Sequence, residues 1–236
     1  MLGFIGGGLM AKPNPEELAG LALQNYYKQD FTQAKKYFEK SCDLNFGMAC
    51  GALGNLYGDG RGVEKNLTKA TQYFSKACDL KYGRGCNDLG ELYYNGKDIE
   101  KNLTKATQYF SKACDLNNGG GCSNLGVLYQ NGQVVEKDLT KAAYLYSKAC
   151  ELKEGLGCFN LGALYYNGKG VEKDLIKAAY FYSKACDLKE GMGCGNLGVL
   201  YYNGDGVKRD SKKADQYFSK ACKLGYQEAC EALKEK

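Results

Sequence analysis

The sequence predicts an all-α fold: a right-handed superhelical solenoid of stacked helix pairs, stapled by disulfide bonds. Two observations predict it. The cysteines recur with a fixed period, and apolar side chains follow a helical pattern twice within each period. Each unit of such a repeat has an apolar face that only a neighbouring unit can cover, so consecutive units are expected to stack.

The cysteines reveal the repeat. All 12 fall into pairs whose members are 8 residues apart, and successive pairs start 36 residues apart. Such a strict interval indicates a tandem array of 36-residue units. The pairs are Cys42 and Cys50, Cys78 and Cys86, Cys114 and Cys122, Cys150 and Cys158, Cys186 and Cys194, and Cys222 and Cys230.

The sequence pattern of each unit predicts two helices. The first runs from Gly83 to about Tyr94 in one unit and ends at Asn95-Gly96, since Gly or Asn commonly follows the end of a helix. The second runs from about Asn102 to Leu116. Only Asn and Asp occupy its first position, which predicts an N-cap in all five units; these residues are Asn66, Asn102, Asp138, Asp174 and Asp210. Two of them also match the N-x-[ST] glycosylation pattern, which is the alternative interpretation.

We expect the two cysteines of each pair to be bonded to each other. Eight residues of helix rise about 12 Å, but bonded cysteines need Cα atoms within about 7 Å, so the chain must turn between them. A glycine five residues after the first cysteine provides for that turn; these are Gly47, Gly83, Gly119, Gly155 and Gly191. Zinc ligation and free core thiols are the alternatives. Disulfides persist outside a reducing cytosol, so they predict a secreted or periplasmic protein.

Composition excludes several functions. The net charge of +5 comes from 32 basic and 27 acidic residues, too even a balance for a nucleic-acid-binding surface. Histidine is absent, which removes histidine-based catalytic triads and zinc sites. We expect no metal, no cofactor, no nucleic acid and no membrane span.

No known catalytic constellation is found, so the catalytic residues stay unknown. Serine β-lactamases and penicillin-binding enzymes use S-x-x-K together with S-D-N and K-T-G, and none of these motifs occurs. The carboxylates Asp59, Asp88, Glu91 and Asp205 are scattered over different units. We interpret them as solvated or ligand-facing side chains rather than as an acid–base pair.

Several motifs resemble known repeats. N-L-G-x-L-Y-Y resembles the signature of tetratricopeptide repeats, whereas N-G-x-G-V-x-K-D and A-C-D-L…G-C resemble Sel-like repeats. One C-x7-C per unit is similar to the Helicobacter cysteine-rich protein family, over about residues 14–236. The resemblance implies a secreted α-solenoid. It also implies penicillin binding and slow β-lactamase activity, although no residue here can be named for that chemistry.

The repeat pattern predicts four segments. Residues 1–11 resemble the end of a secretory signal, and because they lack its basic start and are shorter than the usual length of about 15–30 residues, we interpret them as a truncated or mis-started signal. A disordered N-terminal tag or stub is the alternative. Residues 12–45 form a tetratricopeptide-like capping pair. Five Sel-like repeats follow at 46–225, and a C-terminal capping helix occupies 226–236.

We expect the protein to bind a peptide or protein on its concave surface, which the first helix of each unit lines. In tetratricopeptide domains, an asparagine at the position of Asn124, Asn160 and Asn196 clamps a peptide backbone; the alternative is that these amides only bond the neighbouring helix. The candidate binding residues are Asn55, Asp88, Tyr94, Asn124, Asn160, Tyr166, Asn196 and Tyr202. The loop at 167–172 is the second candidate location. A host protein, a β-lactam or a cell-wall fragment are the possible partners.

Overall fold

The computed structural model describes residues 14–96 and 99–234, so the signal-like segment at 1–11 lies outside the described residues. Within the described residues the chain forms thirteen α-helices and no strand, which confirms the predicted all-α fold. The helices group into two compact units, and the division along the chain falls between Leu80 and Lys81.

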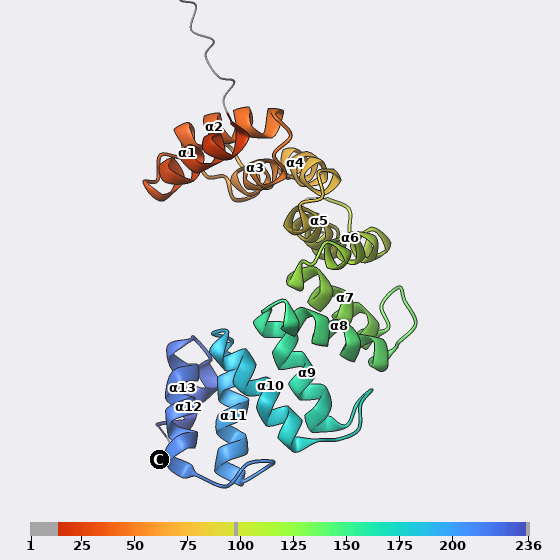
Figure 1. Ribbon diagram of the computed structural model, residues 1–236, viewed down its shortest axis with the longest axis vertical. Coiled ribbons are helices and arrows are strands. Elements are labelled where there is room, and N and C mark those ends of the chain that lie inside the picture. Colours follow the sequence, from red (N-terminus) through yellow and green to blue (C-terminus); the bar gives the residue numbers. More distant parts are fainter. Residues whose placement is uncertain (1–13, 97–98, 235–236) are drawn as a thin grey trace, which may run out of the picture. The chain divides into compact units, whose positions relative to one another are not determined.

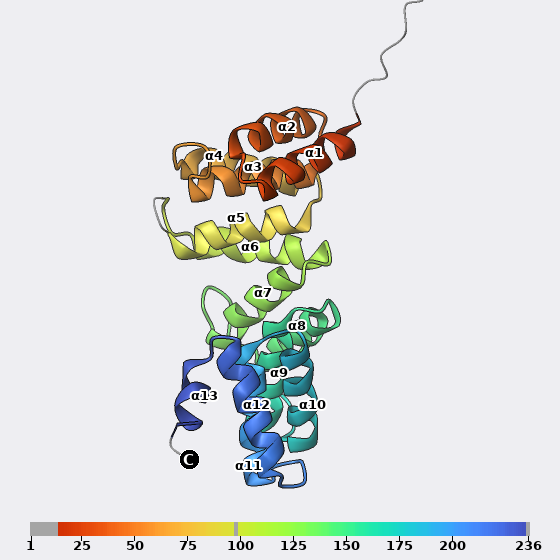
Figure 2. The same cartoon turned by 90° about the vertical axis from the view of Figure 1, so that its left-hand side faces the viewer.

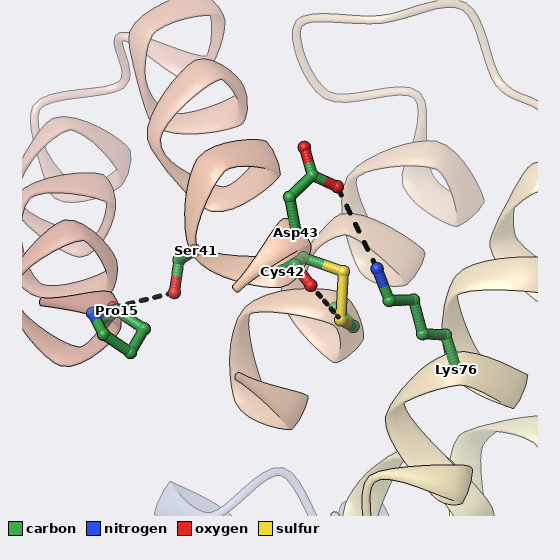
Figure 3. The surroundings of a disulfide bond; sticks show 6 residues. Pro15, Ser41, Cys42, Asp43 and Lys76 are labelled. Carbon is green, nitrogen blue, oxygen red and sulfur yellow. Dashed lines mark hydrogen bonds and ion pairs between the residues drawn. A yellow bond between two sulfur atoms is a disulfide. The ribbon is translucent and has the colours of Figure 1, made fainter. Parts of the chain in front are cut away.

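The first unit holds four helices, drawn from red to yellow in Figure 1. They are α1 (Pro15–Tyr27), α2 (Phe31–Asp43), α3 (Gly47–Asp59) and α4 (Leu67–Asp79). Each helix packs against the next along the chain. Figure 3 shows how the end of α2 is held: the buried Ser41 hydroxyl donates to the Pro15 carbonyl at 2.7 Å, and Asp43 forms an ion pair with Lys76 at 3.9 Å.

The second unit holds nine helices within the described residues. They are α5 (Gly83–Asn95), α6 (Leu103–Asp115), α7 (Gly119–Asn131), α8 (Leu139–Glu151), α9 (Gly155–Asn167), α10 (Leu175–Asp187), α11 (Gly191–Asn203), α12 (Ser211–Lys223) and α13 (Gln227–Ala232). We call the odd-numbered helices from α3 to α11 the A helices, and the even-numbered helices from α4 to α12 the B helices. Within this unit, α7, α9 and α11 each contact both the B helix of their own repeat and that of the repeat before (Figure 2).

The predicted N-caps are confirmed at all five B helices. In each case the Asn or Asp carboxamide or carboxylate oxygen accepts a hydrogen bond of 2.8–3.0 Å from the backbone N–H three residues later. This bond satisfies one of the donors that a helix start leaves without a partner. Capping therefore accounts for the residue type at all five positions.

The prediction that a glycine provides the turn between the two cysteines was wrong. The chain reverses between a B helix and the next A helix at a non-glycine residue in the left-handed region, with φ of 58–65° at Asn45, Lys81, Asn117, Lys153 and Lys189. The glycine two residues later is instead the first residue of the A helix. At Gly119 a Cβ atom would lie 2.9 Å from the Cβ of Glu154 in the following turn. Glycine is needed here for close approach between successive turns.

The predicted disulfide bonds are confirmed. Five pairs have Cα–Cα distances of 4.5–4.8 Å across the turn between helices. Cys78 and Cys86 are disulfide-bonded as well, and no cysteine among the described residues is free. Each covalent staple limits how far the helix end and the next helix start can separate.

The core lies between A and B helices and depends on small residues facing rings. Gly126 of α7 faces Tyr146 of α8 so closely that a Cβ atom would stand 2.7 Å from the ring. Tyr146 is fully buried, and this burial raises the pKa of its phenol. The same glycine–ring packing recurs in each repeat, which fixes the ring of the B helix against the A helix.

Candidate ligand-binding surface

The structure carries all eight candidate binding residues on A helices. Asn55 is on α3, Asp88 and Tyr94 on α5, Asn124 on α7, Asn160 and Tyr166 on α9, and Asn196 and Tyr202 on α11. Seven of them are half-buried, whereas Tyr202 is exposed. Four of the eight line two pockets that lie in equivalent repeats of the second unit.

The first pocket, called the α9–α11 pocket, has a volume of about 280 Å³. Tyr166 and Asn196 form part of its wall, and Tyr182 of α10 contributes a ring. Asn196 lies within hydrogen-bonding reach of the Tyr182 phenol, whose pKa is raised chiefly by burial. Ala163, Val199 and Leu200 make most of the remaining wall apolar. Asn167 is the other polar residue that lines the pocket. An apolar wall with a few fixed polar groups is typical of a side-chain-binding pocket.

The second pocket, called the α5–α7 pocket, has a volume of about 220 Å³. Tyr94 and Asn124 occupy the same repeat positions here as Tyr166 and Asn196 do in the first pocket. Phe110 of α6 takes the place of Tyr182, and its ring lies 6.4 Å from that of Tyr94. The remaining lining residues are Glu91, Asn95 and Val127. The pocket therefore adds one carboxylate to an otherwise similar wall.

A buried amide joins the helices beside the α5–α7 pocket. Asn87, only 8% exposed, donates to the Glu91 carboxylate at 2.8 Å and accepts from the Asn124 amide at 3.0 Å. The Asn124 amide also reaches the Glu91 carboxylate at 3.3 Å. Both N–H groups of Asn124 are thus directed at α5. At this position the asparagine does bond the neighbouring helix, and its carbonyl oxygen is what it can still offer to a ligand.

Asp88 lies in the same cluster, and its carboxyl group is largely buried. Burial raises the pKa of its carboxyl to about 6, with the nearby Glu91 adding to the shift and Arg84 opposing it. Its Oδ2 is buried without a hydrogen-bond partner, and the Arg84 guanidinium stays 3.8 Å away. The ionised carboxylate is therefore poorly compensated within the protein.

The repeat between the two pockets is arranged differently. Gln130 occupies the position of Tyr94 and Tyr166, and its carbonyl oxygen accepts a 3.0 Å hydrogen bond from the Tyr146 hydroxyl. Asn160, the candidate amide of this register, is half-buried on α9. Its side chain makes no hydrogen bond to another described residue, so both its N–H groups and its carbonyl are available to a ligand.

The structure does not bring Asn55 and Tyr202 into these pockets. Asn55 belongs to the first unit. Tyr202 lies at the end of α11, where the Arg209 guanidinium stands 5.8 Å from the centre of its ring. Neither residue lines either pocket.

The sequence analysis did not predict the aromatic residues that B helices contribute to the pockets, or the buried amide of Asn87. Phe110 and Tyr182 come from B helices, whereas the predicted rows considered A helices alone. An aromatic residue 16 positions after Tyr94 and Tyr166 was the available signal. Asn87 stands where the other units have Gly51, Ser123, Phe159 and Gly195, so the repeat pattern did not mark it.

Two features are absent from the described residues. No group of three or more Cys, Asp or Glu side chains there is arranged to hold a metal ion. No helix in that part of the chain has the length and apolarity needed to cross a membrane.

A family model described as the Sel1 repeat matches most of the chain. The matched segments are residues 17–46, 47–82, 83–118, 120–154, 155–190 and 192–226. They include the first helix pair, and every segment after the first begins within one residue of the start of an A helix.

Curated relatives match shorter segments. HcpC of Helicobacter pylori strain J99, provisionally named a beta-lactamase, is 62% identical over 61 residues, which cover 26% of this chain and 21% of that protein. HcpA of the same strain, named a beta-lactamase, is 50% identical over 60 residues, which cover 25% of this chain and 24% of HcpA. The chain thus spans less than a quarter of the length of each of these relatives.

Solved structures match nearly the whole chain. A Sel1 repeat protein from Oxalobacter formigenes is 27% identical with a TM-score of 0.83, and the match covers 92% of this chain and 86% of that one. The protein c5321, described as a protective antigen of uropathogenic Escherichia coli, is 26% identical with a TM-score of 0.77 over 92% of this chain and 50% of its own.

Proposed function

The chain belongs to the Sel1 repeat family, and on this premise we propose that it is an exported scaffold that binds a peptide, or an extended segment of a protein, along its A helices. The observation that carries the proposal is the recurrence of one polar position above two equivalent pockets. Asn124 and Asn196 each line a pocket, and Asn160 stands between them with an amide that bonds no other described residue. We call Asn124, Asn160, Asn196, Tyr94 and Tyr166 the A-helix row.

An extended peptide fits this arrangement because of its backbone. Every peptide unit carries a donor and an acceptor that must find partners when water is removed. An asparagine side chain offers both kinds of group. Amides placed once per repeat can bond several peptide units in register, while Tyr94 and Tyr166 cover the chain with amphipathic rings.

Export is the second element of the proposal, and the disulfides support it. Bonded cysteines persist where the surroundings are oxidising, such as the periplasm or the outside of the cell. Thiol titration of the denatured, unreduced protein recovered from its native cells should read near zero. A reading near all 12 thiols would identify a reducing compartment and overturn export.

Peptide binding is tested first by selection. A phage-displayed library of random dodecapeptides is passed over the immobilised, oxidised full chain, with a blank surface in parallel. We expect peptides that enrich on the protein and not on the blank. Absence of any such peptide would overturn the proposed function.

A double variant then locates the binding. Asn160→Ala combined with Asn196→Ala should weaken a selected peptide at least tenfold, because each lost amide leaves a ligand group unpaired at a cost of about 1–3 kcal/mol. The matched control is Gln72→Ala with Gln108→Ala, which removes two exposed amides from B helices. Circular dichroism must show equal helicity in both. Equal affinity of the two double variants would move the site away from the A-helix row.

β-Lactam binding with slow hydrolysis is the alternative, and the names of HcpC and HcpA favour it. It is tested by nitrocefin turnover with rigorously purified protein and with each of the eight serines replaced in turn. Turnover that one serine substitution abolishes would establish an intrinsic enzyme. Turnover that survives every substitution would point to contaminating enzyme or to non-specific chemistry.

A further inference from the structure

The two pockets lie exactly two repeats apart and differ mainly in charge. Every lining position of the α5–α7 pocket has its counterpart 72 residues later in the α9–α11 pocket. Glu91 in one pocket corresponds to Ala163 in the other, and Val127 corresponds to Val199. The backbone therefore builds the same cavity twice, and the side chains make one acidic and the other apolar.

Glu91 of the α5–α7 pocket has no cation paired with it among the described residues, although the Lys101 ammonium lies 5.5 Å from the centre of the Tyr94 ring. Glu91 is exposed, and its carboxylate accepts bonds only from the amides of Asn87 and Asn124. Among the described residues, no ammonium or guanidinium forms an ion pair with Glu91. The buried Oδ2 of the neighbouring Asp88 has no hydrogen-bond partner and forms only a long ion pair of 3.8 Å with Arg84. A ligand cation placed at Glu91 would gain charge-assisted hydrogen bonds.

The walls of this pocket also suit the stem of a basic side chain. Tyr94, Phe110 and Val127 present apolar surface in the pocket that Glu91 also lines. Lys and Arg bury their aliphatic stems along such a surface and keep the charged end at the polar rim. An acidic side chain would instead meet the repulsion of Glu91 and Asp88.

The α9–α11 pocket suits an apolar side chain. Ala163 replaces the Glu91 carboxylate with a methyl group, and Val199, the counterpart of Val127, is 40% exposed. Covering such surface is favourable by roughly 25 cal/mol per Å². Tyr166 and Tyr182 offer ring faces and edges to an aromatic partner as well.

The distance between the pockets sets the spacing of the two ligand side chains. α5 contacts α7, and α7 contacts α9, so the pockets are separated by two helix-to-helix steps. Packed helices are about 8–10 Å apart, which places the pockets about 16–20 Å apart. An extended chain advances about 3.3 Å per residue, so this span holds about five or six residues. In the repeat between the two pockets, Gln130 is hydrogen-bonded to the Tyr146 hydroxyl.

We propose that the ligand is an extended peptide with a Lys or Arg side chain in the α5–α7 pocket and a large apolar side chain in the α9–α11 pocket, about five or six residues apart. This inference rests on the proposed function and specifies its ligand. The two pockets give the bound peptide a direction along the A-helix row. Residues of the peptide between them meet Asn160 and Gln130 and carry little side-chain selection.

The test uses the sequences recovered from the dodecapeptide selection. We expect Lys or Arg enriched about five or six positions from Phe, Tyr, Leu or Met, in a single order along the peptide. The selection is repeated with Glu91→Gln, which keeps an acceptor for Asn87 and Asn124 but removes the charge. That variant should lose the basic preference and keep the apolar one. Glu64→Gln, an exposed glutamate outside both pockets, is the matched control and should keep both.

The outcomes separate this inference from the proposed function. Enriched peptides with no paired preference would overturn the inference and leave peptide binding intact. Enriched peptides whose basic preference survives Glu91→Gln would overturn the acidic pocket as its source. Failure of any peptide to enrich would overturn both.

Discussion

The α5–α7 and α9–α11 pockets are one cavity built twice, and comparing them separates what the repeat fixes from what it leaves free. Both have a tyrosine and an asparagine on A helices and a ring from a B helix. Glycine under each ring keeps the helices close: Gly90 below Phe110, and Gly162 below Tyr182. Because these features set the backbone, the cavity recurs. Glu91 and Ala163 occupy the same position in the two pockets and take no part in the glycine–ring packing, so they can set what each pocket accepts.

The largest effect should come from breaking the shared framework. Gly162→Val would place a Cβ atom 2.8 Å from the Tyr182 ring and 3.4 Å from the Ala178 carbonyl oxygen. We expect a loss of about 3 kcal/mol in the free energy of unfolding, measured by urea denaturation, because the packed ring must move. Gly20→Ala is the control, since nothing lies within 4 Å of its added Cβ. That variant should be neutral or slightly stabilising. Equal stability of the two variants would contradict the close packing.

The second largest effect should be a pH-dependent change in stability at Asp88, which lies beside the α5–α7 pocket and has no acidic counterpart beside the α9–α11 pocket. The pKa of Asp88 is about 6 in the folded chain against an ordinary value of 3.8, so the folded state binds the proton more tightly than the unfolded state. The stabilising effect of that proton is full below about pH 4 and is lost as the pH rises through about 6. Asp88→Asn should therefore raise the free energy of unfolding by about 2 kcal/mol near neutral pH.

The same substitution should have little effect near pH 4, where folded Asp88 already carries its proton. Urea denaturation at both pH values checks this, with Asp115→Asn as an exposed control. A gain of the same size at both pH values would show that charge burial is not its cause.

A carboxylate placed in the α9–α11 pocket should give it the ligand preference of the α5–α7 pocket. Ala163→Glu puts a carboxylate at the position that corresponds to Glu91. Peptides selected on the unaltered chain should bind this variant about tenfold more weakly, because an apolar side chain would have to desolvate the carboxylate. Fluorescence polarisation measures the affinity. Replacing the apolar side chain of the peptide by Lys should restore binding, and failure to restore it would contradict the equivalence of the two pockets.

The smallest effect should come from the repeat between the pockets. Val134 in the α7–α8 loop has φ of 70°, where the equivalent loops have Gly62, Gly170 and Gly206. A β-branched residue pays a penalty in this left-handed conformation, which the greater entropy of unfolded glycine partly offsets. Val134→Gly should stabilise the chain by about 0.5–1 kcal/mol in thermal unfolding and leave peptide affinity unchanged. A destabilising result would mean that the Val134 side chain makes contacts that outweigh the strain.

How much the sequence could predict depends on which interactions are local. Asn102 and Asp138 indicated helix starts because capping depends on residues three positions away. Cysteines 8 residues apart could indicate bonds because the connecting turn is short. Tyr94 and Asn124 could be placed in rows by periodicity alone. The wall formed by Phe110, and the bonds that tie Asn124 to Asn87, depend on how three helices meet. No pattern along one helix contains that information.

The central claim is that a peptide lies along the A-helix row, and a crystal structure of the chain with a selected dodecapeptide tests it most directly. The account predicts an extended peptide whose backbone is hydrogen-bonded by Asn160 and Asn196, with its apolar side chain in the α9–α11 pocket. A peptide bound instead on the B helices, or on the loop at 167–172, would contradict the account.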